Sequence, residues 1–260
     1  MSYLEELFNL EGKVAAIIGG SGALGGEIAW TLAQAGAHTS ILYYSNLDKA
    51  NTVCSRIKQS GGSADAWHVD IRNEQSIQNN VKVIALKNGG VDILVNASGI
   101  NYVNPVADIS DEDWNHVLDI NMKGVFLASR VFALHMVETG RKGSIINLSS
   151  LTSKKPFSNE LVYGISKAAV NNMTRFLANE WASHGLRVNT IIPGFFPAEK
   201  MRKNMAEDQQ QAIFDYTPMK RFGEVEELAG VVLWLASEKA SSYVTGTIIP
   251  VDGGFSAAAV

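Results

Sequence analysis

The segment Gly19-Gly20-Ser21-Gly22-Ala23-Leu24-Gly25-Gly26 joins a short apolar run, Val14–Ile18, to an amphipathic stretch, Leu24–Ala35. Five apolar residues, then glycines, then a helical period are typical of a buried strand that turns directly into a helix. Glycines in such a turn let the backbone approach a pyrophosphate, whose charge the first amides of the helix stabilise. Glycine-rich turns also occur for purely steric reasons, but this strand–turn–helix context favours dinucleotide binding. The expected cofactor contacts are Gly19, Ser21, Gly22, Leu24 and Gly25.

The same alternation of short apolar runs and longer amphipathic stretches continues along the chain. It predicts an α/β fold with a doubly wound, Rossmann-type parallel sheet of about seven strands and helices on both faces. The predicted strands are Val14–Ile18, Thr39–Tyr44, Ala66–Val69, Ile93–Asn96, Ser144–Leu148, Val188–Ile192 and Thr247–Val251. The predicted helices are Leu24–Ala35, Asp48–Gln59, Glu74–Lys87, Asp111–His135, Tyr163–His184 and Glu224–Ala236.

A length of 260 residues suits one dinucleotide-binding and catalytic domain over residues 1–260. The segment from Phe195 to Lys220 follows the sixth predicted strand and has no clear period. Ligands of doubly wound sheets bind outside the carboxyl ends of the strands, so we predict a substrate lid at 195–220. Lys200, Arg202 and Lys203 in this segment form either a clamp for a substrate carboxylate or a solvated helix face.

Composition argues against several classes of partner. The net charge is −4 and no basic stripe is present, which disfavours nucleic acid. No apolar run reaches the roughly 18 residues of a membrane helix, and residues 1–12 lack the features of a secretory signal. Cys54 is the single cysteine, which fits a reducing cytoplasm, and the five histidines show no metal-ligand spacing. We therefore expect a cytoplasmic protein without a metal.

The end of the second predicted strand bears on cofactor choice. An acidic residue there would bind the adenosine ribose hydroxyls of NAD. This chain instead has Tyr43-Tyr44-Ser45-Asn46, and Asp48 already belongs to the following helix. Neutral residues leave room for a 2′-phosphate, so Ser45 and Asn46 are expected to contact NADP. No arginine follows this strand to bind the phosphate, and NAD stays the alternative.

Tyr163 and Lys167 stand four residues apart, on one face of a predicted helix. A second such pair, Tyr216 and Lys220, contains Pro218, which disfavours helix around it. Only Tyr163 also follows a predicted strand that ends in a serine pair, and Ser150 lies thirteen residues before it. The spacing therefore selects Ser150, Tyr163 and Lys167 as candidate catalytic residues.

A phenol has a pKa near 10 in water, too high for a base at neutral pH. A nearby ammonium and a positively charged nicotinamide both favour the phenolate, so we expect the pKa of Tyr163 to be lowered. Tyr163 would then act as general acid and base, with Lys167 as its electrostatic partner and Ser150 as a donor to the substrate oxygen. The structural alternative is a half-buried helix tyrosine beside a solvated lysine.

This arrangement resembles the single-domain branch of the short-chain dehydrogenase/reductase family over nearly the whole chain. Asn96-Ala97-Ser98-Gly99 resembles the family's element after the fourth strand, which lines the cofactor cleft, and Asp70-Ile71 resembles its adenine-contacting pair. The resemblance implies that Asn121 holds a proton-relay water and that Pro193-Gly194 lies near the nicotinamide.

Three positions depart from the family pattern. Ile18 replaces a threonine before the phosphate loop, and Ala23 replaces the usual middle glycine. Ala198 stands where many members have a threonine that contacts the carboxamide, so the resemblance leaves the detailed nicotinamide contacts open.

The resemblance implies an NAD(P)-dependent oxidoreductase that moves a hydride between the nicotinamide and a hydroxyl or carbonyl of a small substrate. Residues 193–199 and 217–223 resemble the members that act on sugar acids, such as the mannonate oxidoreductases. A polyol or ketose dehydrogenase and a general carbonyl reductase are the alternatives within this class. An epimerase and a noncatalytic dinucleotide-binding sensor are alternatives of another class. The resemblance also implies a homotetramer.

Overall fold

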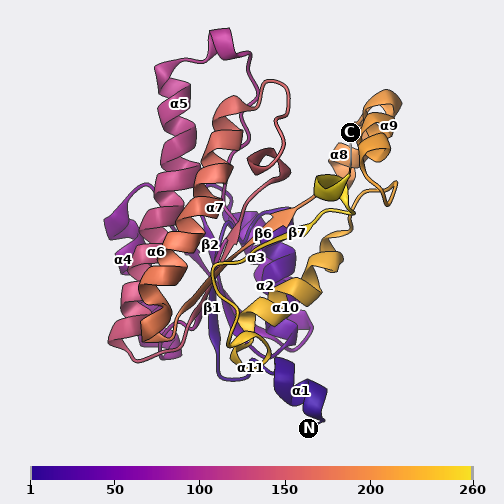
Figure 1. Cartoon of the computed structure of the whole chain (residues 1–260). Helices are drawn as coiled ribbons and strands as arrows, with labels where there is room; N and C mark the ends of the chain where they lie inside the picture. The colour runs from indigo at the N-terminus through magenta and orange to yellow at the C-terminus, as the bar shows by residue number, and fades with distance from the viewer. Residues whose placement is uncertain (1, 259–260) are drawn as a thin grey trace.

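A parallel seven-stranded sheet with the order β3-β2-β1-β4-β5-β6-β7 forms the centre of the structure (Figure 1). This computed structural model describes residues 2–258, and the side chains of Glu199 and Lys200 lie outside that description. The strand order reverses between β1 and β4, which is the switch point at which doubly wound folds bind their ligands. The strands are β1 Val14–Ile18, β2 His38–Tyr43, β3 Ser63–His68, β4 Ile93–Asn96, β5 Ser144–Leu148, β6 Arg187–Pro193 and β7 Ile248–Val251.

Helices cover both faces of the sheet, as Figure 1 shows. On one face lie α4 Glu74–Asn88, α5 Asp111–Leu118, α6 Val125–Glu138 and α7 Leu161–Trp181. On the other lie α2 Ala23–Gln34, α3 Leu47–Gln59 and α10 Ala229–Ala236. The shorter helices are α1 Tyr3–Phe8, α8 Glu199–Asn204, α9 Glu207–Tyr216 and α11 Glu238–Ser241.

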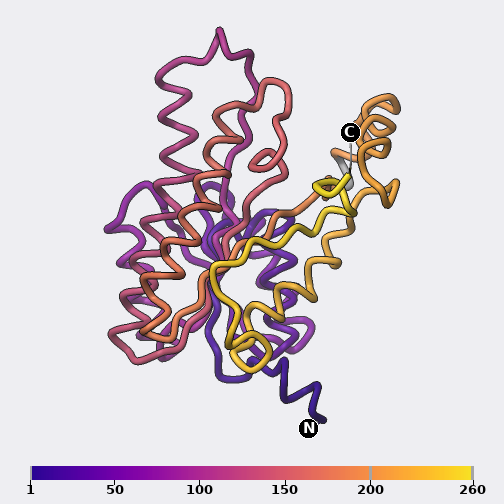
Figure 2. Tube along the Cα trace, in the orientation of Figure 1, coloured from indigo at the N-terminus to yellow at the C-terminus, as the bar shows by residue number. Residues whose placement is uncertain are grey.

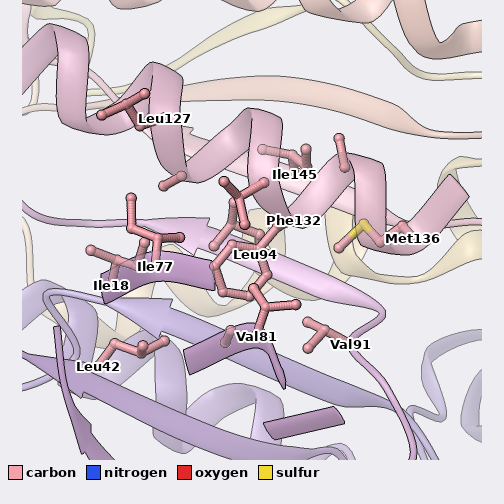
Figure 3. Close-up of a cluster of buried hydrophobic side chains, with 14 of the residues drawn as sticks. Ile18, Leu42, Ile77, Val81, Val91, Leu94, Leu127, Phe132, Met136 and Ile145 are labelled. Carbon is pink, nitrogen blue, oxygen red and sulfur yellow. The ribbon is translucent and has the colours of Figure 1, made fainter. Parts of the chain in front are cut away.

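Two hydrophobic cores result, one on each face, because successive residues of a strand point to opposite sides. Ala16 and Ile18 of β1 belong to the core under α4, α6 and α7, whereas Ala15 and Ile17 belong to the core under α2, α3 and α10. Figure 3 shows the first core, where Phe132 of α6 lies among side chains of the strands and of α4. The doubly wound fold and its strands are as predicted, with small shifts at their ends.

Two predicted segments differ from the structure. The single helix expected over Asp111–His135 is interrupted by a π-helical turn, Asp119–Gly124, between α5 and α6. The segment 195–220, expected to be irregular, contains α8 and α9. No residue of α9 is buried, and Glu207 and Asp208 occupy its first turn. A helix without a buried face needs no apolar period in its sequence, which is why α9 was not predicted.

The segment 195–220 and the C-terminal residues lie side by side at one end of the molecule (Figure 2). The amide of Met219 donates to the carbonyl of Gly253 at 3.1 Å, and the rings of Tyr216 and Phe255 are 6.4 Å apart. Both segments follow strand ends, β6 and β7, at the carboxyl edge of the sheet. Within residues 2–258, no helix is both long and apolar enough to cross a membrane.

Replacing Ile84 by alanine tests the core on the α4 face. Ile84 is fully buried, so Ile84→Ala is expected to lower the free energy of unfolding by about 2–5 kcal/mol. The matched control is Leu86→Ala on the same helix, because Leu86 is 87% exposed and its truncation should cost less than about 0.5 kcal/mol. Urea titrations of both variants make the comparison, and equal losses would contradict this placement of α4.

Candidate active site

The phosphate loop connects β1 to α2 in a geometry that requires glycine. Gly19 has φ +78°, and a Cβ on it would lie 2.7 Å from the amide nitrogen of Ser98. A Cβ on Gly25 would overlap the carbonyl oxygen of Gly19. The N-cap of α2 is Gly22, whose lack of a side chain leaves the first-turn amides without a side-chain acceptor. These amides face the loop and can stabilise a phosphate.

A cavity of about 490 Å³ opens beside this loop at the sheet's switch point. The Oγ atom of Ser98, on its wall, is buried and has no hydrogen-bond partner among the described residues. An orphaned hydroxyl beside uncapped helix amides fits a polar, phosphate-bearing ligand such as a dinucleotide. Nine predicted cofactor contacts line the cavity: Gly19, Ser21, Gly22, Ser45, Asp70, Ile71, Ala97, Ser98 and Gly99.

Other predicted contacts do not line this cavity. The Oδ1 atom of Asn46 accepts from the amide of Lys49 at 2.8 Å, so this side chain caps α3. Leu24 and Gly25 lie in the first turn of α2, behind the loop. Pro193 pairs with Val251 at the end of β6, and Gly194 lines a neighbouring cavity of about 350 Å³.

Asn96 holds the sheet together and does not line the cavity. It is 1% exposed, and its Nδ2 donates to Oγ of Ser129 at 3.0 Å and to Oδ1 of Asn147 at 2.8 Å. Asn147 in turn donates to Oγ1 of Thr174 on α7 at 2.9 Å. This buried polar chain links β4, β5 and α7 just below the cavity.

The end of β5 and the second turn of α7 bring the candidate catalytic groups together. Lys167 is 4% exposed, and its Nζ donates to the carbonyl of Leu148 at 3.1 Å. Ser149 Oγ donates to the carbonyl of Lys167 at 3.0 Å. Tyr163 lies one turn earlier, with its ring centroid 5.7 Å from Nζ of Lys167, and Ser150 is close enough to its phenol to act on the pKa of that group.

Asn121 reaches the same place from the π-helical turn. It is fully buried, and its Oδ1 accepts from the amide of Ile100 at 2.9 Å while its Nδ2 donates to the carbonyl of Ile100 at 2.9 Å. Nδ2 also lies 3.2 Å from Oγ of Ser166, its acceptor on α7. A Cβ on Gly99 would lie 3.2 Å from Nζ of Lys167 and 3.3 Å from Oδ1 of Asn121. Asn121 and Lys167 therefore meet on one side of Gly99. Helical turns of the π type occur often at functional sites.

The pKa values in the protein alone differ from the sequence expectation for the tyrosine. Burial lowers the pKa of Lys167 to about 8. Burial raises the pKa of Tyr163, and the hydrogen bond with Ser150 offsets only part of that increase. The expected lowering is therefore absent from the protein alone, because desolvation disfavours the phenolate more than its neighbours stabilise it.

The basic residues of the segment 195–220 do not form a free cluster. Nη1 of Arg202 pairs with Oε1 of Glu224 at 3.0 Å, and the guanidinium lies 5.5 Å from the ring centroid of Phe222. A part-exposed carboxylate of the protein thus already pairs with Arg202, which fits the solvated helix face better than a free carboxylate clamp. Lys203 is exposed, and the side chain of Lys200 lies outside the described residues. Lys220 donates to the carbonyl of Asp215, away from Tyr216.

The cavity wall contains an arginine that was not expected from the sequence. Arg72 follows β3, and its Nη2 donates to the hydroxyl of Tyr44 at 2.7 Å. The expectation that no arginine stands at the end of β2 is therefore wrong, because β3 pairs with β2 and the residues that follow β3 lie beside the end of β2. The sequence did contain one indication of its role, because Arg72 directly follows the Asp70-Ile71 pair that was expected to contact the adenine. Within the part of the chain that the structure describes, no three His, Cys, Asp or Glu side chains are grouped to hold a metal ion.

Comparisons with known proteins agree with this geometry. Residues 20–256 match a family model described as enoyl-(acyl carrier protein) reductase. A gluconate 5-dehydrogenase of Gluconobacter oxydans is 33% identical over 96% of this chain and 96% of the relative. Glucose 1-dehydrogenase 2 of Bacillus subtilis is 36% identical over 95% of each chain.

Among solved structures, a gluconate 5-dehydrogenase from Burkholderia cenocepacia in complex with NADP and tartrate superposes with a TM-score of 0.92. It is 32% identical, and the match covers 99% of this chain and 100% of that chain. The sheet order, the phosphate loop and relatives of this length and identity lead to one conclusion. The chain belongs to the short-chain dehydrogenase/reductase family and is an NAD(P)-dependent oxidoreductase.

Proposed function

We propose that this chain interconverts a hydroxyl and a carbonyl group of a small sugar acid, with NADP as its cofactor. The observation that carries the proposal is the buried Lys167 ammonium near the Tyr163 ring, at the carboxyl end of β5. Gly99, which lines the cavity beside the phosphate loop, adjoins this ammonium. Buried, mutually oriented titratable groups at a cleft are typical of catalysis.

When bound, the nicotinamide supplies the acceptor or donor of a hydride. In alcohol oxidation, the phenolate of Tyr163 takes the hydroxyl proton as the carbon loses its hydride, and in reduction the phenol returns that proton to the oxygen. The Ser150 hydroxyl donates a hydrogen bond to the reacting oxygen. The Lys167 ammonium stabilises the phenolate, and Asn121 positions the Ile100 backbone and Ser166 beside Tyr163. The cavity beside Gly19 and Gly22 holds the dinucleotide.

The sugar-acid proposal draws on the relatives, since one is a gluconate 5-dehydrogenase solved with tartrate, a dicarboxylate. In this chain the rings of Phe157, Phe195 and Phe255 pack together beside the 195–220 segment, with centroids 5.4–5.9 Å apart. Lys155 ties this cluster to the last residues by donating to the carbonyls of Phe255 and Ala258. We propose that α8 and α9 form the substrate lid over this aromatic wall. A neutral substrate, such as a polyol or ketose, remains the second candidate, because another relative, glucose 1-dehydrogenase 2, is named for a neutral sugar.

We further propose a homotetramer in the cytoplasm. Phe176 on α7 is 69% exposed and Leu134 on α6 is 48% exposed, and apolar side chains on adjoining helices suit contacts with a second copy. A chain with one cysteine, Cys54, forms no disulfide within itself and fits a reducing compartment.

A panel assay of the purified protein tests the proposed function. Sugar acids, polyols and ketoses are each offered with NADP or NAD, and turnover is followed by the absorbance of the reduced nicotinamide. We expect a sugar acid to give the highest kcat/KM and the NADP couple to give a lower KM than the NAD couple. A polyol as the best substrate would replace the sugar-acid proposal, and no turnover of any alcohol or carbonyl would favour the sensor.

Tyr163→Phe tests the acid–base role, because it removes the hydroxyl and keeps the ring. We expect kcat to fall at least about 100-fold while the dissociation constant for NADPH changes little. Tyr216→Phe is the matched control, since Tyr216 belongs to the other Tyr/Lys pair and its exposed hydroxyl should be dispensable. Near-normal turnover by purified Tyr163→Phe would contradict the assignment.

A further inference from the structure

An arginine and a tyrosine from neighbouring strand ends face the same part of the cofactor cavity. Tyr44 follows β2 and Arg72 follows β3, and both line the cavity together with Ser45. The guanidinium carbon of Arg72 lies 5.2 Å from the ring centroid of Tyr44. They stand at the end of β2, where the acidic residue that would bind free ribose hydroxyls is missing.

The hydrogen bonds of Arg72 fix its orientation without using all its donors. Nε and Nη2 donate to the two carboxylate oxygens of Asp70, at 2.9 and 2.7 Å. Nη2 also donates to the hydroxyl of Tyr44 at 2.7 Å. Nη1 has no hydrogen-bond partner within residues 2–258, so two N–H groups remain for a ligand.

The tyrosine contributes a further donor. Its oxygen accepts from Arg72, so its own hydrogen stays free to donate. Asp70 holds the guanidinium in place as a carboxylate, because its hydrogen bonds with Arg72 keep the pKa of Asp70 below its ordinary value. The guanidinium stays charged at every physiological pH. The result is a preformed set of donors, partly charged, on the cavity wall.

We propose that Arg72 and Tyr44 form the site for the 2′-phosphate of NADP, so that Arg72 determines the cofactor preference of this chain. Nη1 of Arg72 and the hydroxyl of Tyr44 both donate to phosphate oxygens, as a fork of charge-assisted donors suits a phosphate. The inference rests on the proposed use of NADP and adds the residue responsible for it.

Binding of two cofactor fragments to the full-length protein tests this site without any turnover. The probes are adenosine 2′,5′-bisphosphate, which carries the phosphate in question, and adenosine 5′-monophosphate, which lacks it. Isothermal titration of the wild type should give at least about tenfold tighter binding of the bisphosphate, as expected for charge-assisted hydrogen bonds to a phosphate. The ratio of the two affinities is the measured quantity.

Arg72→Gln should reduce this ratio to near one while leaving the affinity for the monophosphate close to that of the wild type. Tyr44→Phe should reduce the ratio by a smaller factor, because it removes one donor and keeps the charge. The matched control is Arg130→Gln. Arg130 is also 36% exposed in its side chain, pairs with a carboxylate, and lies over an aromatic ring at 5.1 Å, but it does not line the cavity. Its replacement should leave the ratio unchanged.

If Arg72→Gln does not fold, Arg72→Lys keeps the charge, loses the planar fork and should give an intermediate ratio. An unchanged ratio in Arg72→Gln or Arg72→Lys would overturn the inference. An equal loss of both affinities would overturn it as well, since Arg72 would then only hold Asp70. A wild type that oxidises a sugar acid but binds both fragments equally refutes this site and the NADP preference, and leaves the sugar-acid proposal standing. Full turnover by Tyr163→Phe refutes the catalytic proposal and leaves the affinity ratio untouched.

Discussion

The buried ammonium of Lys167 is the constraint on which the proposed active site depends. Removing an ammonium from water costs several kcal/mol unless polar partners replace the water. One partner is the carbonyl of Leu148 at the end of β5. The next residue, Ser149, donates a hydrogen bond from its hydroxyl to the backbone carbonyl of Lys167. The residue after these two is Ser150, so the contact that holds the lysine also sets the distance between the serine and Tyr163.

This constraint has a cost for the free protein. The pKa of Lys167 is about 8 in the fold and 10.5 as the ordinary value. The unfolded chain therefore binds the proton more tightly, so burial of this charge opposes folding below pH 8 and ceases to do so as the pH rises through 10.5. A lower free energy of unfolding, caused by one buried charge, is typical of active sites. The polar chain from Asn96 through Asn147 to Thr174, fully inside the sheet–helix interface, keeps β4, β5 and α7 aligned around that charge.

The sequence was sufficient for those features that depend on local pattern. The number and order of the strands, the glycine turn after β1 and the closeness of Tyr163 to Lys167 follow from apolar period, glycine spacing and chain order. The π-helical turn at Asp119–Gly124 was not predicted, because the extra residue changes only the phase between the apolar faces of α5 and α6, and each helix keeps its own helical period.

Other features depend on the three-dimensional arrangement. Arg72 was missed because it lies 28 residues from Tyr44 in sequence and is brought beside it by the pairing of β2 with β3. The raised pKa of Tyr163 was missed because desolvation depends on everything packed around the phenol. Arg202 was assigned to a clamp or to solvent because its partner, Glu224, lies outside the segment 195–220.

The central claim is that Tyr163 becomes a base only when the positive nicotinamide joins the Lys167 ammonium beside it. A titration of phenolate absorbance tests it directly, as the difference between wild type and Tyr163→Phe with and without NADP⁺. In the protein alone the phenolate of Tyr163 should form only above about pH 10, since burial raises its pKa. With NADP⁺ bound, the same signal should move to lower pH. A titration that is identical with and without the cofactor would contradict the account.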